Sequence, residues 1–182
     1  MGRVLGAEVP DGVVALMGRK IEGLAPEAAR ALELAACMGH VFELATLAAT
    51  AERSQRDAAN DISPALVAGL ALPTSAEYRL VHTGWDESLG ELPPSIKVSY
   101  RFMHDCVRQA AYARLGEADR QQIHLQIGRL LRRDRYDRGD EVALFDVVRH
   151  LNLGAARLTD ASERLDLAQM NLTAGLGEKA RG

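Results

Sequence analysis

The sequence contains few of the residues from which metal, disulfide and nucleotide sites are built. Its 182 residues include two cysteines, Cys37 and Cys106, which are too few for a disulfide framework or a zinc site. Three lysines are present, and none stands in a G-x-x-x-x-G-K-S/T loop. The motifs of zinc proteases, dinucleotide-binding folds and serine hydrolases are also missing. We therefore expect a chain that is not an enzyme and binds no cofactor by itself.

An excess of basic charge and long apolar runs are absent too. The formal net charge is -3, whereas nucleic-acid binders usually carry a positive surface. No apolar stretch approaches the roughly 18 residues of a membrane span, and the first residues lack the pattern of a signal peptide. These absences predict a cytoplasmic protein without a membrane segment, in which nucleic-acid binding would require a local basic face.

Alanine-rich stretches with helical periodicity dominate what is present. Hydrophobic residues make up 47% of the chain, enough for a buried core, and they recur at spacings of three and four. The fold is therefore expected to be mainly α. The expected helices are residues 11–23; a helix from Pro26 to Gly39; residues 43–51; a helix capped by Ser54, kinked or split at Pro64 and closed by Gly69; residues 105–115; and three later helices with apolar stripes at Ile123, Ile127 and Leu130, at Leu144, Val148 and Leu151, and at Leu165, Ala168 and Leu172.

A strand signal occurs at residues 96–102, where four apolar residues alternate with polar ones. A looser alternation at residues 78–82 predicts the partner strand of a hairpin, with residues 83–95 as a long acidic tip. Helices followed by a hairpin and a further helix are typical of a winged-helix domain. The sequence thus predicts a winged helix with one β-hairpin, followed by antiparallel helical hairpins.

Five longer strings point to a family. They are LELAACMG at residues 32–39, FELATLA at 42–48, PALVAGL at 64–70, YRFMHDCVRQAAY at 100–112 and HLNLG at 150–154. Together they resemble the region just after the ATPase core of bacterial STAND-type signalling ATPases. The resemblance is strongest to large proteins that join a serine/threonine kinase, an AAA-like ATPase and a sensor histidine kinase, and it extends over residues 13–175.

This resemblance implies three parts of a longer signalling protein. Residues 1–24 would be a linker helix from an upstream ATPase domain, residues 25–115 a winged-helix domain, and residues 116–182 the start of a tetratricopeptide-like superhelix that offers surfaces to protein partners. The Walker motifs of the family are missing here, so the chain would be a fragment. Glycines at positions 175 and 177 depart from the family pattern and predict a cut or frayed superhelix at that point.

Met103, His104 and Asp105 lie where the second strand is expected to pass into a helix. The free N–H groups at a helix N-terminus favour an anion, and an adjacent imidazole adds a donor. The string is similar to the Met-His-Asp motif of nucleotide-switch proteins, whose histidine contacts the β-phosphate of ADP. The resemblance implies that His104 senses ADP or ATP held by the missing ATPase domain and that Asp105 positions it. The alternative is a partly buried, hydrogen-bonded His104 beside a capping Asp105.

A DNA-binding winged-helix regulator is the alternative function. Its recognition helix would be residues 54–67, which offer one arginine, Arg56, beside Asp57 and Asp61. Phosphate contacts dominate the affinity of DNA-binding proteins, and this helix supplies few of them. We therefore expect protein partners rather than nucleic acid.

Four further features have structural interpretations. The mixed charges of residues 132–138 are expected at a solvated helix end, with a partner-binding patch as the alternative. His150 should hydrogen-bond the last carbonyls of its helix, and both cysteines should be small core residues. Trp85 would either anchor an interface or fold back onto the hairpin.

Overall fold

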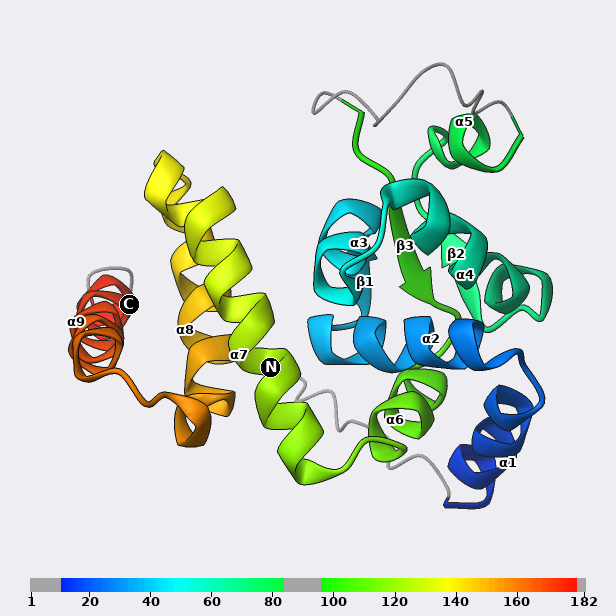
Figure 1. Cartoon of the computed structure of the whole chain (residues 1–182), viewed down its shortest axis with the longest axis horizontal. Helices are drawn as coiled ribbons and strands as arrows, with labels where there is room; N and C mark the ends of the chain where they lie inside the picture. Colours follow the sequence, from blue (N-terminus) through cyan, green and yellow to red (C-terminus); the bar gives the residue numbers. More distant parts are fainter. Residues whose placement is uncertain (1–10, 84–95, 180–182) are drawn as a thin grey trace, which may run out of the picture.

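The structure, a computed structural model, describes residues 11–83 and 96–179 (Figure 1). Residues 84–95 of the predicted hairpin tip, which include Trp85, lie outside the described residues. Helices account for most of the described chain, and a small antiparallel sheet lies among the first of them. The mainly α prediction is therefore confirmed.

A first unit contains the sheet. Its elements in chain order are α1 (Asp11–Glu22), α2 (Pro26–Met38), β1 (Val41–Glu43), α3 (Leu44–Ala51), α4 (Gln55–Val67), β2 (Ala71–Pro73), α5 (Tyr78–Thr83), β3 (Ser99–Phe102) and α6 (Asp105–Ala113). Figure 1 shows α2, α3 and α4 gathered around the strands. Helix α1 turns one apolar stripe inward, since Ile21 is fully buried and Val14 and Met17 pack against the core.

The bounds of α4 follow from its capping residues. The Ser54 hydroxyl accepts a 3.0 Å hydrogen bond from the Asp57 amide, as the sequence predicts for an N-cap. At the other end Gly69 has a φ of 66°, and the Leu70 amide reaches back to the Ala65 carbonyl at 2.9 Å. Of the kink or split expected at Pro64, the split does not occur, because α4 continues through Pro64 to Val67. A proline in the last turn removes only one donor from a helix whose inner face is already buried.

The sheet has the strand order β1-β3-β2, with both pairs antiparallel. The burial alternation predicted for residues 96–102 is confirmed, because Val98, Tyr100 and Phe102 are buried and Arg101 is exposed, but the strand itself is shorter than predicted and covers Ser99–Phe102. Phe42 of β1 packs against both aromatic rings, with centroid distances of 5.7 and 5.5 Å. The central strand therefore supplies much of the first unit's core.

The prediction that residues 78–82 form the partner strand of residues 96–102 is wrong. Residues 78–82 belong to α5, and β3 pairs instead with β1 and β2. In α5 Val81 is buried, and His82 Nε2 lies 2.9 Å from the Tyr100 hydroxyl. Over so short a segment a two-residue period and a helical period fit the same apolar residues. The observed strand β2 lies at the edge of the sheet. Pro73 has no N–H to donate, and an edge strand tolerates this because one of its sides is unpaired.

A second unit consists of helices only. Its elements are α7 (Glu117–Asp134), the short turns η2 (Tyr136–Arg138) and η3 (Glu141–Ala143), α8 (Leu144–Leu153), η4 (Ala155–Arg157) and α9 (Ala161–Lys179). Helices α7 and α8 run side by side in opposite directions (Figure 1), as predicted. Two glycines permit their close approach: a Cβ on Gly128 would lie 2.7 Å from Leu151 Cδ2, and one on Gly154 would lie 2.7 Å from the Leu125 amide nitrogen.

The described residues form two hydrophobic clusters that meet along α7. Ile123 and Ile127 of α7 belong to the cluster of the first unit, which we call the first core. Leu125 belongs to the other, the second core, together with apolar residues of α8 and α9. Helix α7 is thus a shared wall between the two cores.

Helix α9 buries a different face from the predicted stripe. Leu165 and Leu172 are 60% and 68% exposed, whereas Leu167, Met170 and Ala174 pack in the second core. Both sets have helical spacing, and the sequence does not decide between them. The predicted interruption near position 175 does not occur, because α9 extends to Lys179.

Candidate functional site

The His104–Asp105 pair lies at the N-terminus of α6, as the sequence predicts. Strand β3 ends at Phe102, and His104 is the extended N-cap residue with φ −143° and ψ 154°. The backbone is held there by two bonds of 3.0 Å, from the Met103 amide to the Leu70 carbonyl and from the Val107 amide to the His104 carbonyl. The end of the sheet thus fixes where α6 begins.

The two side chains of this pair are exposed and have different surroundings. The Asp105 carboxylate accepts hydrogen bonds from Arg108 Nε at 2.8 Å and from Gln109 Nε2 at 2.7 Å. The hydrogen bond from Arg108 is the main reason why the pKa of Asp105 is lowered. The His104 imidazole has no hydrogen-bond partner among the described residues. The structure therefore holds Asp105 within its own helix and leaves the imidazole available to a ligand or a neighbouring domain.

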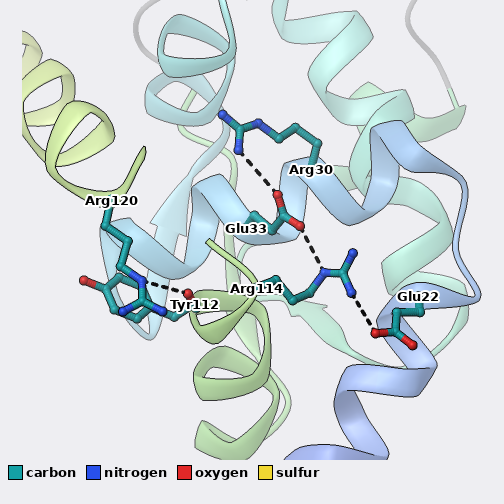
Figure 2. Close-up of polar contacts among 6 residues, drawn as sticks. All are labelled: Glu22, Arg30, Glu33, Tyr112, Arg114 and Arg120. Atoms are coloured by element: carbon teal, nitrogen blue, oxygen red, sulfur yellow. Dashed lines mark hydrogen bonds and ion pairs between the residues drawn. The ribbon is translucent and has the colours of Figure 1, made fainter. Parts of the chain in front are cut away.

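The other end of α6 forms an ionic cluster that the sequence analysis did not find. Figure 2 shows Arg114 between two carboxylates: Nε donates to Glu33 at 3.0 Å, and Nη1 donates to Glu22 at 3.3 Å. Glu33 also accepts a 3.4 Å bond from Arg30. The cluster connects α1, α2 and the end of α6, although its members lie up to 92 positions apart in the sequence.

Tyr112 connects α6 to α7. Its carbonyl accepts a 3.1 Å hydrogen bond from Arg120 Nε, and the Arg120 guanidinium lies 4.5 Å from the centroid of its ring (Figure 2). On the far side, the Tyr112 hydroxyl lies 3.1 Å from His124 Nε2. The end of α6 is therefore attached to α7 by the carbonyl, the ring and the hydroxyl of one tyrosine.

A buried pair of histidines lies next to the Tyr112 hydroxyl, between α7 and α8. His124 of α7 and His150 of α8 are 4% and 1% exposed, and their Nδ1 atoms lie 2.9 Å apart. His150 Nε2 lies 3.1 Å from Arg149 Nη2, which also donates to the Met38 carbonyl at 3.2 Å. The prediction that His150 bonds the last carbonyls of its helix is wrong, because its ring points to α7.

Burial keeps both imidazoles neutral. It lowers the pKa of His124, with the positive charge of Arg149 acting in the same direction. It lowers the pKa of His150 to about 3, again with a contribution from Arg149. A groove of about 470 Å³ between β1, α7 and α8 reaches His150 and Arg149.

The remaining candidate residues have structural roles. Cys37 is buried, burial raises the pKa of its thiol to about 12, and Cys106 is buried and free, which confirms both as core residues. In the charged run at residues 132–138, Arg132 pairs with Asp166 at 2.9 Å and Arg135 with Asp140 at 2.7 Å. No group of three or more metal-ligating side chains occurs within the described residues. In the same part of the chain, every helix is too short or too polar to cross a bilayer.

The comparisons with known proteins give one informative similarity. The chain is 27% identical over 199 aligned residues to the hybrid signal transduction histidine kinase G of Dictyostelium discoideum. The aligned region covers 92% of this chain and 6% of that protein, so the chain spans a small fraction of this relative's length. No protein-family model and no solved structure matches the chain. The similarity is therefore to one short segment of a much longer signal-transduction protein.

Proposed function

We propose that this chain is a non-enzymatic regulatory segment of a multidomain signalling ATPase, in which a winged helix senses the nucleotide held by a neighbouring ATPase domain. The observation that carries the proposal is the exposed His104 imidazole, without a partner among the described residues, at the N-terminus of α6. A donor at this place can reach a phosphate oxygen supplied by another domain. The similarity to a much longer signal-transduction protein agrees with such a context.

The arrangement of the first unit supports the winged-helix part of the proposal. Helix α2, strand β1, helices α3 and α4, and strands β2 and β3 occur in the order of that fold, with α5 inserted before β3, and the central strand is the last one. Helix α1 packs against α6 and is tied to it by the Glu22–Arg114 ion pair. In a longer protein, α1 would be the linker through which the ATPase domain and α6 contact each other.

The second unit supports a role as the start of a helical scaffold. The exposed face of α9 carries Leu165, Ala168, Leu172 and Leu176. Charged residues beside this face are engaged elsewhere: Glu163 pairs with Arg129 at 2.6 Å, and Arg164 donates to the Leu158 carbonyl at 2.9 Å. A helix that is apolar on two opposite faces is typical of one covered on both sides. A further helix of the parent protein would cover this face.

The sensor role is tested by His104→Ala in a longer parent protein that contains the ATPase domain. Loss of one hydrogen bond made only in the closed, ADP-bound state removes roughly 0.5–3 kcal/mol. ADP affinity should therefore fall about two- to a hundred-fold, with little change in ATP affinity, when both are measured by calorimetry.

A matched control is His40→Ala, since His40 is also exposed and lies close enough to Asp105 to affect its pKa. It should leave the ratio of ADP to ATP affinity unchanged. An unchanged ratio in His104→Ala, together with a lowered melting temperature, would show that His104 is only structural.

A further inference from the structure

We propose that Tyr112, His124, His150 and Arg149 form a directional hydrogen-bond relay that joins the two cores, and that protonation of the histidine pair releases α8 and α9 from the first unit. The four side chains come from α6, α7 and α8, and successive polar atoms lie 3.1, 2.9 and 3.1 Å apart. Arg149 also bonds the Met38 carbonyl at the end of α2. The relay therefore connects both units across α7.

The direction of the relay follows from the chemistry of arginine, which donates hydrogen bonds and accepts none. Arg149 must donate to His150 Nε2, so His150 carries its proton on Nδ1 and donates it to His124 Nδ1. His124 then carries its proton on Nε2 and donates it to the Tyr112 hydroxyl. Each ring has one tautomer that satisfies both of its contacts.

An added proton is incompatible with this arrangement. An imidazolium has two N–H groups and no acceptor. Protonated His150 would point Nε2–H at the Arg149 guanidinium, and protonated His124 would point Nδ1–H at the Nδ1–H of His150. Either event breaks a buried hydrogen bond and adds charge to a site between two apolar clusters.

The charges around the pair do not favour the protonated form. Arg149 and Arg120 both oppose a positive charge on His124, and Glu117 is the acid that favours it. Titratable and charged groups surround the pair on every neighbouring element, either facing it or lining its groove. They are Tyr112 on α6, Glu117 and Arg120 on α7, Arg135 just after α7, Asp146 and Arg149 on α8, His40 and Glu43 at β1, and Cys37 on α2 beside Tyr112. The groove also gives solvent protons a route to His150.

The position of His124 explains why release would be local. Its neighbours Ile123 and Leu125 belong to the first and second core respectively. The relay is thus a polar joint between two apolar contacts. Breaking it leaves each core with its own packing and removes polar contacts between α8 and the first unit, while Arg120 still holds α7 to the Tyr112 carbonyl at the end of α6.

The tautomers are tested by nitrogen-15 NMR of the imidazoles in the full 182-residue chain. At pH 7 we expect a proton on Nδ1 of His150 and on Nε2 of His124. The opposite tautomer in either ring, or a charged ring at pH 7, would overturn the proposal.

Release is tested by amide hydrogen exchange of the same chain between pH 7 and pH 4, corrected for intrinsic exchange. Amides of α8 and α9 should exchange at least about ten-fold faster relative to those of α2 at the lower pH.

Tyr112→Phe removes the final acceptor of the relay and should increase the relative exchange rate of α8 and α9 about two- to ten-fold already at pH 7. The matched control is Tyr78→Phe, which changes a tyrosine outside the relay. Equal loss of protection in α2, α8 and α9 at every pH would refute the joint, and so would an unaffected Tyr112→Phe chain.

Discussion

The two units of the molecule are built differently. In the first, helices surround a sheet whose central strand is fully buried at Tyr100 and Phe102. In the second, α9 is covered on one side only, and Leu165 and Leu172 remain exposed on the other. The first unit builds its core around the sheet and uses α7 as one wall, whereas the second consists of helices and packs α8 and α9 on the other face of α7. We therefore expect the units to differ in stability, and four predictions test this difference.

The largest effect should come from Phe102→Ala, which empties the centre of the first core. Truncation of a buried phenylalanine costs about 3–5 kcal/mol. Urea denaturation followed by circular dichroism should show loss of stability for the whole chain.

Met170→Ala in the second core should instead free α9, while the amides of α2 and β3 keep their protection from hydrogen exchange. Simultaneous loss of protection in both units of the Met170 variant would contradict the difference between them.

A second effect is expected on acidification. The folded-state pKa of His150 lies far below its unfolded value, so the stability it contributes is complete above pH 6.5 and falls as the pH decreases toward about 3. The slope is about 1.4 kcal/mol per pH unit for this residue. Urea midpoints measured between pH 7 and pH 4 report it before most carboxylates are protonated. A flat profile over this range would show that the pair is not buried and neutral.

A third effect concerns the contact between α7 and α8. Gly154→Ala would place a Cβ 2.7 Å from backbone atoms of Leu125, and φ at this glycine is negative, so the cost is steric. We expect a loss of about 1–3 kcal/mol by thermal denaturation. Gly18→Ala in α1 is the matched control, since no atom lies within 4 Å of the new Cβ. It should be neutral or stabilising by up to about 1 kcal/mol. Equal effects of the two alanines would argue against the close helix contact.

The smallest effect should follow Leu172→Lys on the open face of α9. A substitution at an exposed site changes stability by less than about 0.5 kcal/mol. The melting temperature of the chain should therefore hardly change, whereas a longer parent whose next helix covers this face should be destabilised. Strong destabilisation of the chain itself would mean that the face is already covered.

Local features were the ones that the sequence predicted well. Ser54, Pro26 and Gly39 bound their helices as expected, because caps act within a few residues. Strands β1 and β2 carry no sequence signal, since three residues show no period, and α5 is too short for its helical period to be distinguished from the alternation of a strand. The position of His104 at the start of α6 was predicted from a short string. The role of that residue stays a prediction.

Long-range features could not be predicted in this way. His124 and His150 lie 26 positions apart, and they meet only because α7 and α8 pack closely at two glycines. Arg114 contacts Glu22 and Glu33 across 92 and 81 positions. For α9, two apolar stripes were available, and only the packing of the neighbouring helix shows which one is buried.

The placement of the two cysteines allows unfolding of the first unit to be followed by the reactivity of its own thiols. Cys37 on α2 and Cys106 on α6 are both buried in the first core, and the second unit has no thiol. The raised pKa of Cys37 further suppresses its reaction while the chain is folded. The rate of labelling by a thiol reagent therefore measures how often the first unit opens, without any engineered probe. A chain with α8 and α9 released would remain unlabelled, so the same assay separates opening of the joint from opening of the core.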